Sequence, residues 1–212
     1  MNYQKYIISF VPGSSGRFVS RVLDRLILQS TTPITISDVN SVHSDIRDYT
    51  GISMININDP DVFDRLYFDP PGKGPENYGP SSSILATHVY PDFDKINEKY
   101  QDVGVILIRV KPEDLKEVVF NSALKNENLM LDTRTLLNKV VVYNRQNYLF
   151  LKDDFYPANC LILDYPEIYN KLKLLKKLMD FTGIDTVPDG LYDSCERYIA
   201  NRTIIVNQNS LR

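Results

Sequence analysis

Three consecutive segments decide the fold: Tyr6-Ile-Ile-Ser-Phe-Val11, Pro12-Gly-Ser-Ser-Gly-Arg17 and Phe18-Val-Ser-Arg-Val-Leu-Asp-Arg-Leu-Ile27. The first is a short, mostly apolar run, which is typical of a buried strand, and the last places apolar residues at helical spacing along one side. The glycines and serines between them favour a tight turn. The order of strand, glycine-rich turn and helix predicts a helix that packs on a sheet directly after the turn.

The turn has the composition of an anion-binding loop. Backbone N–H groups at the start of a helix point outward at the positive end of the helix dipole, where a phosphate is stabilised. Gly13 and Gly16 permit a tight turn and a close approach of the backbone to an anion. Ser14 and Ser15 add hydroxyl donors, and Arg17 adds a permanent positive charge. The residues therefore predict a site for a dianion, although an ordinary strand-to-helix turn would have a similar composition.

The loop lacks the residues that bind magnesium and nucleoside triphosphates. In the nucleotide-triphosphatase motif, four residues separate the glycines, and Lys and Ser or Thr follow the second glycine. Here Gly13 and Gly16 are closer together and are followed by Arg17 and Phe18. Magnesium-dependent hydrolysis of ATP or GTP is therefore disfavoured.

Length and composition indicate one domain over residues 1–212. With 43% hydrophobic residues, a chain of 212 residues can bury a sizeable core. No segment reaches the ~18 apolar residues of a membrane span, and residues 1–5 lead into the first strand without a signal peptide. We therefore expect a soluble, cytoplasmic protein that does not bind membranes. A net charge of -3 argues against a nucleic-acid partner.

The histidines and cysteines indicate neither a metal centre nor a disulfide framework. The two histidines, His43 and His88, are too few and too far apart to suggest a zinc site, so we expect no metal. The two cysteines, Cys160 and Cys195, have neither metal-ligand nor disulfide-framework spacing. We expect both cysteines to be core residues.

Farther along the chain, apolar strands alternate with helices. Strands are predicted at 84–87, 103–108 and 160–163, and helices at 92–100, 112–125, 131–151, 170–181 and 189–201. Strands this apolar, separated by helices, predict a parallel sheet covered on both faces. Residues 69–83 are rich in Pro, Gly and Ser, which predicts a surface loop or lid over a site.

Polar groups follow three of the predicted strands. They are the loop after Val11, the pair Thr87-His88, and Arg109. Ligands of open parallel sheets bind at the carboxyl ends of the strands, so these groups are expected to converge. An imidazole with an ordinary pKa near ~6.5 can accept a proton, which makes His88 a candidate general base. A hydrogen bond from His88 to a neighbour, and a salt bridge from Arg109 to Glu113 or Asp114, are the structural alternatives.

Read together, these segments resemble the sulfotransferase family. The first strand and Pro12-Gly-Ser-Ser-Gly-Arg17 look like the family's 5′-phosphosulfate loop. Ile84-Leu-Ala-Thr-His-Val-Tyr-Pro91 looks like the strand that ends in Thr or Ser and His, and Val105-Ile-Leu-Ile-Arg109 is similar to the strand that supplies an arginine for the 3′-phosphate. Leu161-Ile-Leu-Asp-Tyr165 and Leu178-Met-Asp-Phe-Thr-Gly-Ile-Asp185 resemble the late strand and a helix end of the family. The likeness spans residues 5–185.

The resemblance implies an α/β fold of the P-loop NTPase-like type, a three-layer sandwich with a central, mostly parallel sheet flanked by helices. It implies transfer of a sulfuryl group from 3′-phosphoadenosine-5′-phosphosulfate (PAPS), without a metal, to a hydroxyl or amine of a small-molecule or glycan acceptor. His88 would be the general base, Arg17 would assist catalysis, and Arg109 and Ser122 would bind the 3′-phosphate. The 5′-phosphosulfate would be held by Gly13, Ser14, Ser15, Gly16, Arg17 and Phe18. The compact size and the loop also resemble small sulfotransferase-like proteins of viral or marine microbial origin.

Two departures from the family pattern leave other functions open. The loop lysine is absent, with Gly13 near its place and Arg17 as a candidate substitute. The position of the family's 3′-phosphate serine falls near Glu117, whose charge would repel a phosphate, so Asn121 or Ser122 would have to serve. A nucleotide kinase-like phosphotransferase and a catalytically silent nucleotide- or anion-binding protein are the alternatives.

Overall fold

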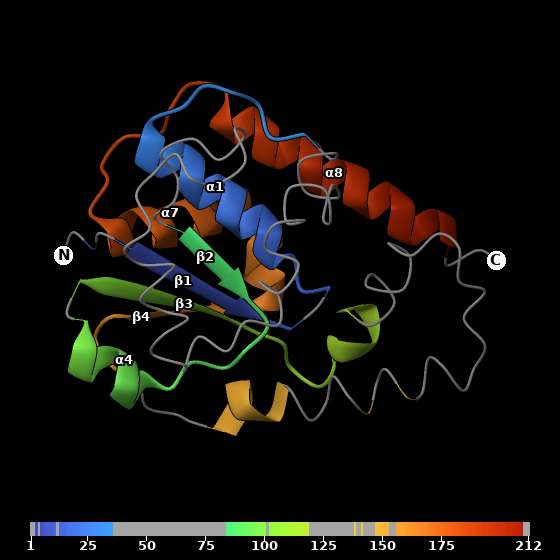
Figure 1. The fold of residues 1–212 in the computed structure, drawn as a ribbon. Helices are drawn as coiled ribbons and strands as arrows, with labels where there is room; N and C mark the ends of the chain where they lie inside the picture. Colours follow the sequence, from blue (N-terminus) through green and yellow to red (C-terminus); the bar gives the residue numbers. More distant parts are fainter. Residues whose placement is uncertain are drawn as a thin grey trace, which may run out of the picture.

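A parallel sheet of four strands forms the centre of the fold (Figure 1). The computed structural model describes residues 3, 5–11, 13–35, 84–100, 102–118, 138, 141, 147–152 and 156–209. The strands are β1 (Lys5–Phe10), β2 (Ile84–Thr87), β3 (Val103–Arg109) and β4 (Cys160–Asp164). Their order across the sheet is β2-β1-β3-β4, and each neighbouring pair is parallel.

The central strands β1 and β3 are buried on both faces, which explains their continuous apolar sequence. Successive side chains of a strand point to opposite faces of the sheet. Ile8 and Ile106 accordingly pack in one core, whereas Ile7 and Val105 pack in a second core on the other face. A sheet with two apolar faces requires helices on both of them.

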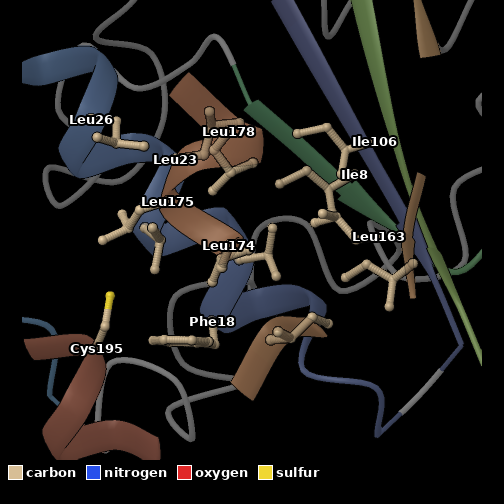
Figure 2. Packing of buried hydrophobic residues seen from close by; sticks show 14 of the residues in the cluster. Ile8, Phe18, Leu23, Leu26, Ile106, Leu163, Leu174, Leu175, Leu178 and Cys195 are labelled. Atoms are coloured by element: carbon tan, nitrogen blue, oxygen red, sulfur yellow. The ribbon is translucent and has the colours of Figure 1, made fainter. Parts of the chain in front are cut away.

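Three helices cover the first face: α1 (Gly16–Leu28), α7 (Lys171–Thr182) and α8 (Leu191–Asn209). Figure 1 shows α1 and α7 on the same side of the sheet, with α8 beyond them. Figure 2 shows this core from close by, with side chains of α1 and α7 facing those of the sheet and Cys195 of α8 at the side away from it. The labelled members are Ile8, Phe18, Leu23, Leu26, Ile106, Leu163, Leu174, Leu175, Leu178 and Cys195.

The second face is covered by α4 (Phe93–Lys99) and by helical residues at 115–118 and 147–152. Ile96 of α4 packs there with Leu115, Val118 and Phe150. In Figure 1, α4 lies on the opposite side of the sheet from α1. The described part of the chain is therefore a sheet between two helical layers.

A short 3₁₀ helix, η3 (Tyr165–Tyr169), joins β4 to α7. The side chain of Asn170 caps α7 by accepting a hydrogen bond from the Lys173 N–H at 3.1 Å. Gly183 ends α7 in the left-handed conformation, with φ of 74°, as glycine commonly does at a helix C-terminus. These two signals fix where α7 begins and ends.

The expected α/β class is confirmed, with a sheet that is parallel throughout the described strands and flanked by helices. The strands predicted at 84–87, 103–108 and 160–163 agree with β2, β3 and β4 to within one residue at each end. The helix expected from 112 begins at 115, and residues 119–125 of that prediction lie outside the described residues. The expected lid at 69–83 and most of the helix expected at 131–151 lie outside them as well. Within the described helices, none combines the length and apolar composition needed to cross a bilayer.

Candidate functional site

Three strand ends meet at the carboxyl edge of the sheet. The registers of β1 with β2 and with β3 bring the loop after Phe10, His88 after β2 and Arg109 of β3 to the same edge. The chain leaves β1 toward the face covered by α1, whereas residues 115–118 follow β3 on the opposite face. Where the chain leaves two adjacent parallel strands toward opposite faces of the sheet, open α/β sheets commonly bind their ligands.

The loop after β1 begins with a tight turn held by a serine. The backbone N–H of Ser14 donates to the Val11 carbonyl at 3.0 Å, and the Ser14 hydroxyl donates to the same oxygen at 2.7 Å. Gly13, the residue before Ser14, has φ of 90°, which suits glycine at the third position of a type II turn. The Ser14 side chain is fully buried, so its hydroxyl stabilises the turn itself.

Ser15 forms the boundary between the turn and α1. It adopts the left-handed conformation, with φ of 64°, and its carbonyl accepts the N–H of Val19 at 3.2 Å. The amides of Gly16, Arg17 and Phe18 therefore lie ahead of the first helical hydrogen bond, at the positive end of the dipole. This backbone arrangement can hold an anion.

Packing explains Gly16 and Phe18 without a ligand. A Cβ atom on Gly16 would lie 2.1 Å from Cγ of the Phe10 ring, so only glycine fits there. The Phe18 ring is fully buried and stacks on Tyr198 with a centroid distance of 3.9 Å. Gly16 thus brings α1 close to β1, and Phe18 can reach an anion only through its backbone amide.

His88 is tied to the strand that carries the loop. Its Nδ1 lies 2.8 Å from the carbonyl oxygen of Phe10, and the two rings meet edge to face at 4.5 Å. Because a carbonyl oxygen only accepts, Nδ1 carries the proton in this contact, and in the neutral form of the ring the lone pair would lie on Nε2. The adjacent turn is also anchored to β1, because the Ser9 hydroxyl donates to the Val89 carbonyl at 2.6 Å. The orientation of the imidazole is therefore set by the backbone of β1.

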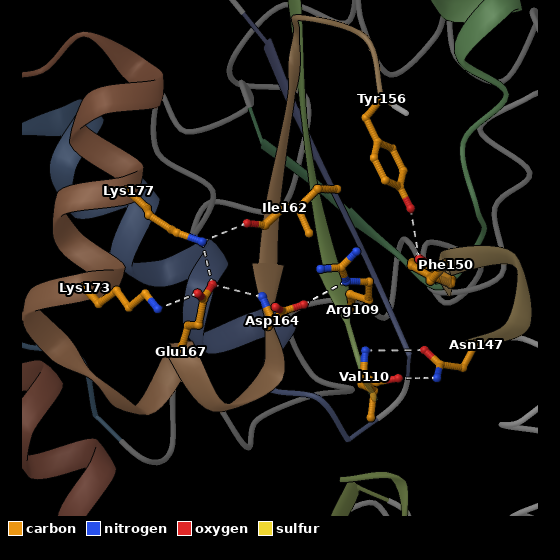
Figure 3. Close-up of polar contacts among 10 residues, drawn as sticks. All are labelled: Arg109, Val110, Asn147, Phe150, Tyr156, Ile162, Asp164, Glu167, Lys173 and Lys177. Carbon is orange, nitrogen blue, oxygen red and sulfur yellow. Dashed lines mark hydrogen bonds and ion pairs between the residues drawn. The ribbon is translucent and has the colours of Figure 1, made fainter. Parts of the chain in front are cut away.

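Arg109 is paired with an acid on the neighbouring strand (Figure 3). Its Nε donates to a carboxylate oxygen of Asp164 at 2.7 Å, a residue that lies directly opposite in the β3–β4 register. This hydrogen bond raises the pKa of Arg109. The predicted alternative of a salt bridge to Glu113 or Asp114 is wrong about the partner, because the register of two distant strands selects Asp164.

Acidic groups surround the end of β3. Burial, together with the charges of Glu113 and Glu117, raises the pKa of Asp114, and Asp164 adds to this effect. The Arg109–Asp164 pair is formally neutral, so the charge available for a phosphate is lower than the presence of an arginine suggests. Electrostatically, the loop at the start of α1 is the better anion site.

A second polar cluster fixes the segment that follows β4 (Figure 3). Glu167 accepts hydrogen bonds from Lys173 at 2.7 Å, from Lys177 at 2.6 Å and from the N–H of Asp164 at 3.1 Å. Burial alone would raise the pKa of Glu167, but these three donors lower it to about 2. Lys177 also donates to the Ile162 carbonyl at 3.3 Å, so the cluster joins β4, η3 and α7.

Hydroxyl groups connect the loop to the far side of the strand ends. The Ser15 hydroxyl lies 2.9 Å from the Tyr169 hydroxyl, Tyr169 donates to the Tyr165 hydroxyl at 3.1 Å, and Tyr165 donates to Glu117 at 2.9 Å. We call these four residues the hydroxyl chain. It links the start of α1, both tyrosines of η3 and the segment after β3.

Ser122 lies outside the described residues, so its predicted role has no counterpart in the structure. In the part of the chain that is described, no group of three His, Cys, Asp or Glu side chains is placed to hold a metal ion.

Comparison with protein-family models, with curated proteins and with solved structures finds no significant match to this chain. The sulfotransferase resemblance therefore rests on the residues themselves.

Residues that link the loop to β4 have no long-range signal in the sequence. Asp164 stands only in the segment Leu161-Ile-Leu-Asp-Tyr165, which resembles the family's late strand, and no pattern indicates Tyr165 or Tyr169 as a partner of Ser15. A local signal was present in Asp164-Tyr-Pro-Glu167, since an N-cap acid followed three residues later by Glu, with Pro between them, is typical of a helical start. That signal predicts the short helix, but it does not predict its contact with the loop.

Proposed function

We propose that this protein is a sulfotransferase that moves a sulfuryl group from PAPS to a hydroxyl or amine, within a P-loop NTPase-like variant of the observed α/β fold. The observation that carries the proposal is the position of His88. Its ring is oriented by the Phe10 carbonyl, at the end of the strand that leads into the loop. A base beside an anion-binding loop at the carboxyl edge of a parallel sheet suits transfer of an anionic group. The proposal keeps the expected cytoplasmic location and the expected small-molecule or glycan acceptor.

The proposed reaction needs a base, an electrophile and a stabilised leaving group. The acceptor oxygen or nitrogen forms a bond to sulfur while the bond between sulfur and the bridging oxygen breaks. The acceptor proton passes to Nε2 of His88, and the electron pair of the broken bond stays on the departing phosphate. Amides of residues 16–18 and the guanidinium of Arg17 would stabilise the charge on that phosphate. Catalysis of this kind is mainly positioning and charge stabilisation.

PAPS, the sulfuryl donor, would be held less well at Arg109 than at the start of α1. The start of α1 suits the 5′-phosphosulfate, since its amides lie at the positive end of the dipole. The 3′-phosphate would meet Arg109, which is already hydrogen-bonded to Asp164. Phosphate binding there would have to share the guanidinium with that carboxylate. We therefore expect the loop to supply more of the affinity than Arg109.

Titration calorimetry with adenosine 3′,5′-bisphosphate, the product of sulfuryl transfer, is the first test. Micromolar binding without magnesium, weakened at least about tenfold in Arg17→Ala, is expected. Arg197→Ala is the matched control, because Arg197 is exposed on α8. Preference for Mg-ATP would favour a kinase-like phosphotransferase instead, and absence of binding by either nucleotide would remove the sulfotransferase proposal.

A second experiment separates catalysis from binding. His88→Asn retains a side-chain N–H that can donate to the Phe10 carbonyl but removes the basic nitrogen. We expect bisphosphate affinity to stay within about threefold of the wild type, while sulfate transfer in an acceptor screen falls by about 10²- to 10⁴-fold. Unchanged transfer would show that His88 is not the base.

A silent nucleotide- or anion-binding protein is the second candidate. The pairing of Arg109 with Asp164, and the acidic groups near Asp114, favour it over a fully active enzyme. Binding of the bisphosphate without transfer to any acceptor class, in wild type and His88→Asn alike, would support this function.

A further inference from the structure

Three hydrogen bonds hold the turn that carries His88. The Ser9 hydroxyl donates to the Val89 carbonyl at 2.6 Å, and the N–H of Val89 donates to the Thr87 hydroxyl oxygen at 3.1 Å. Nδ1 of His88 donates to the Phe10 carbonyl at 2.8 Å. Both polar groups of the Val89 backbone and the imidazole itself are thus bound at the ends of β1 and β2.

Ser9 and Thr87 are polar residues inside the sheet. They are direct neighbours in the β1–β2 register, and neither is exposed to solvent. Ile7 and Val11, which share the face of Ser9 on this segment, pack in the second core. A buried hydroxyl is costly unless it is hydrogen-bonded. The contacts with Val89 meet this requirement, and they fix the Val89 backbone in one place.

His88 has a fixed backbone on both sides. Thr87, the residue before it, pairs with Ser9 in the sheet, and Val89, the residue after it, is bound through its N–H and its carbonyl. The imidazole can therefore reach the Phe10 carbonyl and lie edge to face on the Phe10 ring. A displacement of His88 by about 1 Å would lengthen the contact between Nδ1 and the carbonyl oxygen beyond hydrogen-bond distance.

We propose that Ser9 and Thr87 are positioning residues for His88: by binding both backbone groups of Val89, they hold the imidazole at the Phe10 carbonyl and keep its proton on Nδ1. The hydrogen bond made by one imidazole nitrogen sets the state of the other. In the neutral ring, Nε2 is then the nitrogen that accepts a proton. The catalytic use of Nε2 rests on the proposed function, whereas the effect of the two hydroxyls on the ring does not.

Nitrogen NMR of the imidazole tests the inference without an assay of activity. Proton–nitrogen correlation spectra of the ¹⁵N-labelled full chain are recorded from pH 5 to 9. The chain has two histidines, and the signals of His88 are those that disappear in His88→Asn. In the neutral form of the wild-type ring, we expect Nδ1 at the shift of a protonated nitrogen and Nε2 at the shift of an unprotonated one.

Two substitutions remove the hydroxyls separately, so the test does not depend on the folding of one variant. Thr87→Val keeps the shape of the side chain and loses the hydroxyl, and Ser9→Ala loses the donor to Val89. In each, we expect the ratio of the Nδ1–H to the Nε2–H tautomer to fall at least about fivefold, because free neutral histidine favours Nε2–H. Thr87→Ser retains the hydroxyl and should restore the wild-type signals.

Thr182→Val and Ser194→Ala are the matched controls. They remove buried hydroxyls of α7 and α8, which bind the Leu178 carbonyl at 2.8 Å and the Ile34 N–H at 3.4 Å. Neither control should change the tautomer ratio of His88. A fivefold change in the controls as well would overturn the inference, because the ratio would then report general loosening of the fold.

Two further results would overturn the inference: a neutral wild-type ring with its proton on Nε2, and an unchanged ratio in both Thr87→Val and Ser9→Ala. Failure of the proposed function is a separate result. Absence of bisphosphate binding would remove the sulfotransferase proposal and leave the tautomer measurement intact. If the wild type transfers sulfate, Thr87→Val should lower kcat by about 10- to 100-fold and leave bisphosphate affinity within about threefold, since misplacement of the base affects the reaction step.

Discussion

Replacing Glu167 by Gln should destabilise the protein at neutral pH and leave its stability in strong acid nearly unchanged. Glu167 is the acceptor that joins η3 to β4 and α7, through Lys173, Lys177 and the N–H of Asp164. Its pKa of about 2 lies roughly 2.5 pH units below the ordinary value of 4.5, and such a difference corresponds to about 3.4 kcal/mol.

That free energy is an upper limit, because solvent screens the attraction between Glu167 and the ammonium groups of Lys173 and Lys177. The Glu167 side chain is 15% exposed, but the side chains of Lys173 and Lys177 are 52% and 33% exposed. Ion pairs with exposed partners contribute little, so we expect a loss of about 1–2 kcal/mol at pH 7. Glutamine keeps an oxygen for the Asp164 N–H, which limits the loss to the charged contacts.

The pH dependence follows from the direction of the pKa difference. A carboxylate with a lowered pKa stabilises the folded state fully above the unfolded value, and this stabilisation is lost as the pH falls through the folded value. The difference between wild type and Glu167→Gln should therefore be constant above about pH 5 and shrink between about 4.5 and about 2. Urea denaturation followed by circular dichroism at pH 7, 4 and 2.5 measures it.

Glu98→Gln is the control for this experiment, since Glu98 is exposed on α4. It should change the free energy of unfolding by less than ~0.5 kcal/mol. If Glu167→Gln lowers the free energy of unfolding by the same amount at pH 7 and at pH 2.5, the reasoning is refuted, because the contacts would then not depend on the charge of Glu167.

Three further substitutions or treatments test the packing and the buried groups. Gly16→Ala should lower the free energy of unfolding by about 1–3 kcal/mol, as measured by urea denaturation. The reason is that the alanine Cβ would lie 2.1 Å from the Phe10 ring. An unchanged free energy of unfolding would contradict this packing. Asn147→Leu should lower the free energy of unfolding by about 2–4 kcal/mol in the same assay. The buried Asn147 side chain accepts from the N–H of Val110 at 3.4 Å and donates to the Val110 carbonyl, and leucine can do neither. A decrease below ~0.5 kcal/mol would show that the Val110 groups find other partners. Cys195 is fully buried, and burial raises the pKa of its thiol to about 12, so it should not react with a disulfide reagent at pH 8 until the protein is unfolded; rapid modification of Cys195 in the folded protein would contradict its burial.

The central fold could be predicted because its signals are local. The strands are uninterrupted apolar runs, and α7 is bounded by Asn170 and Gly183. Such features are determined by a few neighbouring residues, so they are visible in the sequence. Their parallel pairing followed from the helices between them.

Partners across the site could not be predicted, because they depend on registers and packing between distant segments. Arg109 meets Asp164 only because β3 and β4 pair in one particular register. The contact between Ser15 and Tyr169 joins residues 154 positions apart, and no local pattern in either segment specifies it. The sequence therefore located the loop, but the partners of its side chains depend on tertiary structure.

The glycines and serines of the loop do not by themselves argue for an anion. Gly13 is needed for a backbone with φ of 90°, and Gly16 is needed because Phe10 occupies the space of a side chain. The hydroxyl of Ser14 closes the turn, and that of Ser15 lies 2.9 Å from the Tyr169 hydroxyl. Each residue thus has a structural reason to be present. Two further residues carry the proposed chemistry: Arg17 at the start of α1, and His88, whose Nδ1 donates to the Phe10 carbonyl. Substitutions at these two positions, rather than at the glycines, separate a group-transfer site from a well-packed turn.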